Sequence, residues 1–126
     1  MRYILIIMIS INLFADMKVI VSNNSQIKTI TQKTLKRLFL GKTKKLNGKK
    51  VIVLDNIDAY DEFYKKIIKK SKKQIHSYWM KQIFLGKKRP PKKIKFNNIV
   101  KKLNSNPIII TYTNKDLNAK VIYETK

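Results

Sequence analysis

The chain has 126 residues, of which 29 are lysine or arginine and 7 are aspartate or glutamate, and its formal net charge is +22. This length suffices for one domain with a modest core and leaves no room in this chain for two full lobes, each a domain of its own. Because the chain has no cysteine, a disulfide framework, a cysteine-ligated metal and a thiol nucleophile are excluded.

The first fifteen residues have the pattern of a secretory signal peptide. Arg2 supplies a positive charge, a mostly apolar run follows, and the small residue Ala15 precedes Asp16. The run falls short of the ~20 apolar residues that a membrane-spanning helix needs, although a buried first strand or a membrane anchor is the alternative. We expect cleavage after Ala15, which leaves residues 16–126 as a periplasmic or secreted protein without a membrane anchor.

The rest of the chain alternates between strand and helix patterns. In chain order, the predicted elements are a strand at 18–22, a helix capped by Thr31, a turn at Asn47-Gly48, a strand at 51–54, helices capped by Asp58 and Ser71, a short helix at 97–103, and strands at 108–112 and 119–123. No Gly-, Ser- or Pro-rich linker divides them. The alternation predicts one α/β domain, with a mainly parallel sheet flanked by helices.

Two predicted helices end on the same four residues. The first ends at Phe39-Leu40-Gly41-Lys42 and the second at Phe84-Leu85-Gly86-Lys87. Glycine can adopt the left-handed conformation that closes a helix, and the following lysine complements the negative end of the helix dipole. We therefore expect Gly41 and Gly86 to have positive φ angles.

Catalytic chemistry has little support in the sequence. His76 is the only histidine, and neither a cysteine nor an acidic cluster lies near it in the sequence to complete a metal site or a catalytic dyad. Asp58, Asp61 and Glu62 are expected to balance the dipole at a helix start. The 3 glycines are too dispersed to form a phosphate-binding loop. We expect a protein that is not an enzyme, with no catalytic residue, metal or cofactor.

The positive charge alone attracts nucleic acids, anionic lipids and anionic solutes. Lysines are spread along all the predicted helices, whereas specific base and phosphate readout relies on arginine, which occurs only at Arg2, Arg37 and Arg89. The aromatic residues have helical spacing that favours core packing over base stacking. No specific nucleic-acid partner is expected.

Several segments together resemble a known family. They are Thr31 to Lys42, the turn Lys45 to Lys50 with the strand Val51 to Leu54, Asp61 to Tyr64, Ser77 to Lys87 followed by Arg89-Pro90-Pro91, and Asn106-Pro107. In this order they resemble the small exported relatives of the phosphate-binding proteins of ABC transporters, within the type 2 periplasmic binding protein superfamily. The resemblance covers most of the chain after residue 16.

The resemblance implies a single ligand-binding lobe that holds an oxyanion at the ends of strands. Two segments correspond to the family's binding loops, and the residues implied are Ser22, Asn23, Asn24, Ser25, Asp55 and Asn56. The second segment departs from the family pattern, because Asp58 and Ala59 replace small hydroxyl donors and nearby carboxylates would repel phosphate. A further departure is Pro107, where relatives have glycine.

The expected function is that of an exported substrate-binding-like protein of the phosphate ABC transporter type, which binds phosphate or another small oxyanion. One alternative is a lobe without a ligand that docks on a transporter, a porin or another envelope component. A basic nucleic-acid-binding protein is the third hypothesis. The loop Ser22 to Ser25, an exposed apolar patch and a basic groove with outward aromatics would distinguish the three.

Overall fold

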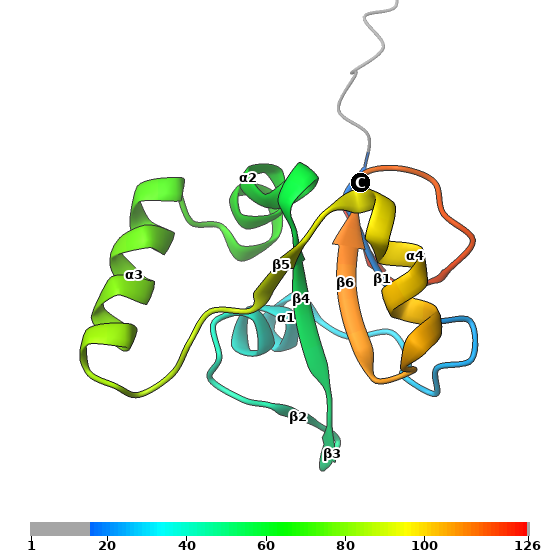
Figure 1. Ribbon diagram of the computed structural model, residues 1–126, viewed down its shortest axis with the longest axis horizontal. Helices are drawn as coiled ribbons and strands as arrows, with labels where there is room; N and C mark the ends of the chain where they lie inside the picture. Colours follow the sequence, from blue (N-terminus) through cyan, green and yellow to red (C-terminus); the bar gives the residue numbers. More distant parts are fainter. Residues whose placement is uncertain (1–15, 126) are drawn as a thin grey trace, which may run out of the picture.

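We describe the fold from a computed structural model, in which residues 16–125 are described (Figure 1). The predicted signal peptide lies outside these residues. The elements are β1 (Lys18–Val21), α1 (Gln32–Phe39), β2 (Lys45–Leu46), β3 (Lys49–Lys50), β4 (Ile52–Asn56), the 3₁₀ helix η1 (Ile57–Ala59), α2 (Tyr60–Phe63), the π-helical turn η2 (Tyr64–Ile68), α3 (Lys72–Phe84), β5 (Lys92–Ile94), α4 (Phe96–Ser105), β6 (Ile109–Thr113) and β7 (Lys120–Glu124). No helix in this part of the chain is long and apolar enough to cross a membrane.

The central sheet has the strand order β5-β4-β6-β1-β7. β4 pairs in parallel with β5 and β6, whereas β1 pairs antiparallel with β6 and β7. Four of the five strands therefore run in one direction and β1 runs against them. The predicted α/β domain with a mainly parallel sheet is confirmed. Strand β5 was not expected, because three residues, two of them lysine, show no apolar run.

Alternate side chains of the strands enter two apolar layers, one on each face of the sheet. On one face, Val19 and Tyr112 join a core beneath α1, α2, η2 and α3. On the other face, Ile20 and Ile109 pack with residues of α4. Within the first layer, the rings of Phe63 and Tyr112 stack with centroids 3.6 Å apart. Phe63, Tyr64 and Trp79 thus pack inward, as their spacing predicts, whereas Phe84 is exposed.

Two of the predicted helix caps are confirmed and one is wrong. The Thr31 hydroxyl accepts from the Thr34 N–H at the start of α1, and Ser71 forms a reciprocal capping box with Gln74 at the start of α3. Asp58 does not cap its own helix, because Asn56 accepts from the Asp58 N–H instead. The Asp58 carboxylate reaches across the fold and accepts from the N–H of the first residue of α4 at 2.8 Å.

Both repeated helix ends are closed by left-handed glycines. Gly41 has φ 69° and Gly86 has φ 65°. At each end, the glycine N–H donates to the carbonyl three residues back, and the next lysine N–H donates to the carbonyl five residues back. This is the hydrogen-bond pattern of a Schellman motif.

We predict that Gly41→Val and Gly86→Val each lower the free energy of unfolding by roughly 1 kcal/mol or more, because a β-branched residue is strained at positive φ. Gly41→Val should cost more, since a Cβ there would lie 3.1 Å from Lys88 Cδ and 3.3 Å from Trp79 Cη2, whereas a Cβ at Gly86 meets open space. Urea denaturation of both variants measures the difference. Equal stability of parent and variants would show that these turns tolerate β-branched residues.

Candidate functional site

The structure places the two predicted binding segments at opposite ends of the sheet. Residues 22–25 follow β1, whereas Asp55 and Asn56 close β4. β1 is antiparallel to β6 and β6 is parallel to β4, so the carboxyl ends of β1 and β4 point in opposite directions. The six predicted residues therefore do not form one site.

The loop after β1 is held by its own polar side chains. Ser22 Oγ accepts from the Asn24 N–H at 3.2 Å, and Ser25 Oγ accepts from the Ile27 N–H at 3.1 Å. The Asn23 amide donates to the Asn118 side chain at 3.0 Å. Both serines are buried and Asn24 is exposed. Because Ser25 Oγ acts as an acceptor in this bond, its hydroxyl hydrogen can still be donated to a ligand, whereas Ser22 and Asn23 do not line the adjacent pocket.

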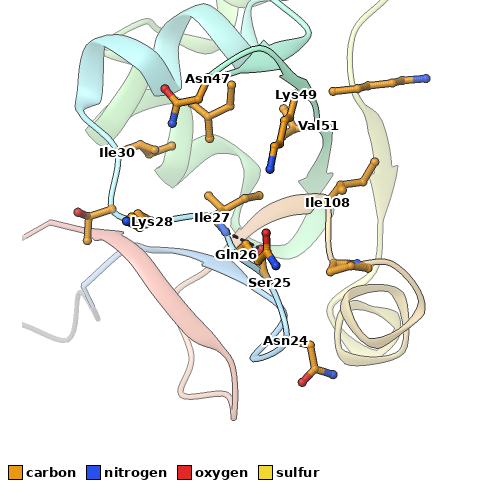
Figure 2. A pocket seen from close by; sticks show the side chains of 14 residues that line it. Asn24, Ser25, Gln26, Ile27, Lys28, Ile30, Asn47, Lys49, Val51 and Ile108 are labelled. Carbon is orange, nitrogen blue, oxygen red and sulfur yellow. Dashed lines mark hydrogen bonds between the residues drawn. The ribbon is translucent and has the colours of Figure 1, made fainter.

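A pocket of about 790 Å³ opens beside this loop. Figure 2 shows it between the segment that begins at Asn24, the β2–β3 hairpin and the residues before β6. Its lining includes the side chains of Ser25, Lys28, Lys49 and Lys50, and it contains no acidic residue. In Figure 2 the Lys49 ammonium points from the hairpin toward Ile27. The pocket is thus cationic and is lined by hydrogen-bond donors of several kinds.

Two of the three pocket lysines, Lys49 and Lys50, are placed by a tight hairpin that the sequence predicts. Asn47 has φ 52° and Gly48 has φ 78°, both in the left-handed region that two-residue hairpin turns require. The turn brings Lys49 back against Leu46 in the β2–β3 pairing. The Asn47-Gly48 pattern predicts this turn. It does not assign the lysines to a site, because nothing in the local pattern shows that the hairpin faces loop 22–25.

At the other end of the sheet, the Asp55 carboxylate is a buried structural group. It is 1% exposed and accepts hydrogen bonds from the hydroxyls of Tyr64 and Tyr112, each at 2.9 Å. Burial raises the pKa of Asp55 to about 7, although the two tyrosine hydrogen bonds and the charge of Lys93 act in the opposite direction. Burial and the charge of Asp55 in turn raise the pKa values of both tyrosines far above their usual range.

Asn56 is likewise occupied by the fold. Its Nδ2 donates to the Tyr112 carbonyl at 3.0 Å, and its Oδ1 accepts from the Asp58 N–H at 3.0 Å. The carboxylates of Asp58 and Glu62 lie in the helical segment that follows. Neither Asp55 nor Asn56 is therefore available to hold an oxyanion, and the nearby negative charge opposes one.

The described residues contain no candidate metal site. His76 is exposed on α3. Within residues 16–125, no group of three or more histidine, aspartate or glutamate side chains could hold a metal ion.

Comparison with known proteins supports the fold alone. No protein-family model and no curated protein matches the chain. Among solved structures, a putative phosphate ABC transporter substrate-binding protein with bound phosphate from Clostridium perfringens is similar with a TM-score of 0.57 at 17% identity, over 79% of this chain and 40% of that chain. An ABC-type phosphate transport receptor from Vibrio cholerae gives 0.52 at 15% identity, over 86% and 46%. PstS from Borrelia burgdorferi gives 0.56 at 14% identity, over 79% and 41%.

The chain thus spans less than half the length of each of these proteins. It has a periplasmic-binding-protein-like fold, of a size that corresponds to a single lobe. Two of these neighbours are described as a substrate-binding protein and a transport receptor.

We predict that Asp55 makes the protein less stable as the pH rises from about 4 to about 7. Its pKa is raised in the folded state, so the folded chain retains a proton that the unfolded chain releases in this range, and stability is lost as the pH passes through the folded-state pKa. A rise from 3.8 to about 7 corresponds to roughly 4 kcal/mol at most.

Urea denaturation at pH 4.5 and 7.5 measures this change in the parent and in Asp55→Asn. The variant cannot ionise at this position, so its stability should fall less between the two pH values. The same fall in both proteins would show that Asp55 does not titrate in this range.

Proposed function

We propose that this chain is an exported, non-catalytic binding lobe that binds phosphate or another small oxyanion in the pocket beside loop 22–25. The observation that carries the proposal is the composition of that pocket, in which lysines and the predicted loop residues Asn24 and Ser25 meet without an acidic residue. Ammonium groups and hydroxyl or amide hydrogens are the donors that a phosphate or sulfate requires, and hydrogen bonds between charged partners are the stronger ones.

The charge distribution favours this end of the sheet over the other. At the carboxyl end of β4, Asp55 is buried and Asp58 accepts a backbone N–H, so a bound anion would face carboxylates. At the pocket, the lysines lower the cost of holding an anion, and the field of the whole chain raises the local anion concentration.

The ligand class and the role are proposed by analogy with the structural neighbours. Two of them are described as phosphate ABC transport proteins, one of these with bound phosphate. By analogy, a small oxyanion is the ligand and a component of a transporter is the partner. A lobe that docks on a transporter or porin component without holding a ligand is the alternative, and it gains support if no anion binds.

Binding should be specific for the anion and should depend on Lys49. At fixed ionic strength, phosphate should raise the melting temperature more than chloride does, because it binds only the folded chain. Lys49→Gln should weaken phosphate binding about tenfold through loss of a charge-assisted hydrogen bond, and Ser25→Ala should weaken it less.

A matched control is Lys101→Gln, which removes the same charge from an exposed position of α4 outside the pocket. It should bind phosphate as the parent does. Equal stabilisation by phosphate and chloride would contradict a specific site, and equal losses in Lys49→Gln and Lys101→Gln would assign the effect to general charge.

Export is proposed from the first fifteen residues of the sequence. Mass spectrometry of the protein recovered from its host should find Asp16 as the first residue. An intact Met1, or retention in the membrane fraction through residues 1–15, would show that this segment is not a cleaved signal.

A further inference from the structure

Helix α3 carries apolar side chains that the core does not cover. Its inner face docks through Ile75 and Trp79, which are buried, and the Tyr78 hydroxyl donates to the Leu40 carbonyl at 2.6 Å. The rest of the helix stands away from the sheet at the left of Figure 1. Only one side of α3 is therefore used by the fold.

The outer side of α3 ends in four exposed apolar residues, which we name the apolar tip. They are Met80, Ile83, Phe84 and Leu85, with exposed fractions of 48%, 45%, 90% and 49%. Met80, Ile83 and Phe84 share one helix face by their spacing. Other large exposed apolar residues of the described chain, such as Val100 and Val121, occur on separate elements. Single exposed apolar residues are ordinary, whereas a contiguous group marks a contact surface.

Positive charge surrounds the apolar tip in the sequence. Lys81 lies within it, and Lys87, Lys88 and Arg89 follow it directly. No acidic residue occurs between Glu62 and Asp116. The ion pair of Lys72 with Asp61, at 4.0 Å, lies at the first turn of α3. Because α3 has 13 residues and rises about 1.5 Å per residue, this carboxylate is about 18 Å along the helix from Phe84. The tip is thus suited to an apolar surface with negative charge around it.

These features distinguish between an anionic protein surface and an anionic lipid surface as the partner of the tip. Protein interfaces are depleted in lysine and enriched in arginine, whereas three of the four basic residues next to the tip are lysines. Lysine clusters beside exposed aromatic and aliphatic side chains are typical of segments that bind anionic lipid headgroups. Phe84, the most exposed of the four, has the kind of side chain that enters the boundary between headgroups and acyl chains.

We propose that the apolar tip of α3 binds reversibly to the surface of an anionic lipid bilayer. Phe84 and its apolar neighbours enter the interfacial region, and the exposed Lys81 and Lys87 contact the lipid phosphates. Lys88, by contrast, is half-buried with its ammonium over the Tyr78 ring. This is a peripheral contact made by one helix end, and it does not depend on the anion pocket, which belongs to other elements.

Vesicle binding tests this proposal, with the chain that begins at Asp16 as the parent, because the apolar run within residues 1–15 would itself bind lipid. Vesicles of phosphatidylglycerol and phosphatidylcholine should bind the parent more tightly than phosphatidylcholine alone. Phe84→Ser should lower binding to the anionic vesicles roughly tenfold or more, because it removes an inserted ring without changing the charge. Val121→Ser, a matched change at an exposed position of β7, should bind as the parent does.

A second measurement uses the absence of cysteine in the chain. An environment-sensitive fluorophore attached at Leu85→Cys should shift to shorter wavelength on the anionic vesicles, and the same label at Val121→Cys should not. Equal vesicle binding by the parent, Phe84→Ser and Val121→Ser would overturn the proposal, because adsorption would then come from charge alone. A change in oligomeric state in Phe84→Ser without a change in vesicle binding would also overturn it and would identify the tip as a protein contact.

Discussion

The direction of a single strand determines how this protein is organised. β1 lies between β6 and β7 and runs against both, as the only reversed strand of the sheet. Its alternating side chains supply both apolar layers, since Val19 and Ile20 belong to different cores. Its reversal also places loop 22–25 at the end of the sheet away from Asp55. The cationic pocket and the buried carboxylate are therefore separate features.

The charged side chains at the two ends of the sheet differ in burial and in hydrogen bonding. At the carboxyl end of β4, the Asp55 carboxylate is buried and accepts hydrogen bonds from the hydroxyls of Tyr64 and Tyr112. Both tyrosines also belong to the apolar core beneath α1. Such a group strengthens the link between β4, η2 and β6, because removal of any partner leaves a buried polar atom without a hydrogen bond. At the pocket, lysines remain exposed to solvent and to anions. The first end therefore has a structural role, and the second is the end at which we propose binding.

Local sequence patterns predicted most of the helices and strands. They did not predict which residues far apart in the sequence come into contact. Thr31, Ser71, Gly41 and Gly86 were recognised because capping is decided by a few neighbouring residues. The partner of Asp58 was missed, since Phe96 lies 38 residues away in the sequence. The sequence also did not show that the six predicted binding residues lie at opposite ends of the sheet. Strand direction is set by pairing between strands that are far apart in the sequence. The position of Asp55 directly after the apolar run Val51 to Leu54 gave no sign of two tyrosine partners.

The central functional claim is that an oxyanion binds at the pocket and not at the carboxyl end of β4. Nuclear magnetic resonance of the labelled protein during phosphate titration tests it most directly, with chloride added to match the ionic strength. We expect saturable shifts of the backbone amide signals of residues 24–30 and 47–50, and little change at residues 56–62. Saturable shifts centred on residues 56–62, or shifts that follow ionic strength across the whole surface, would contradict it.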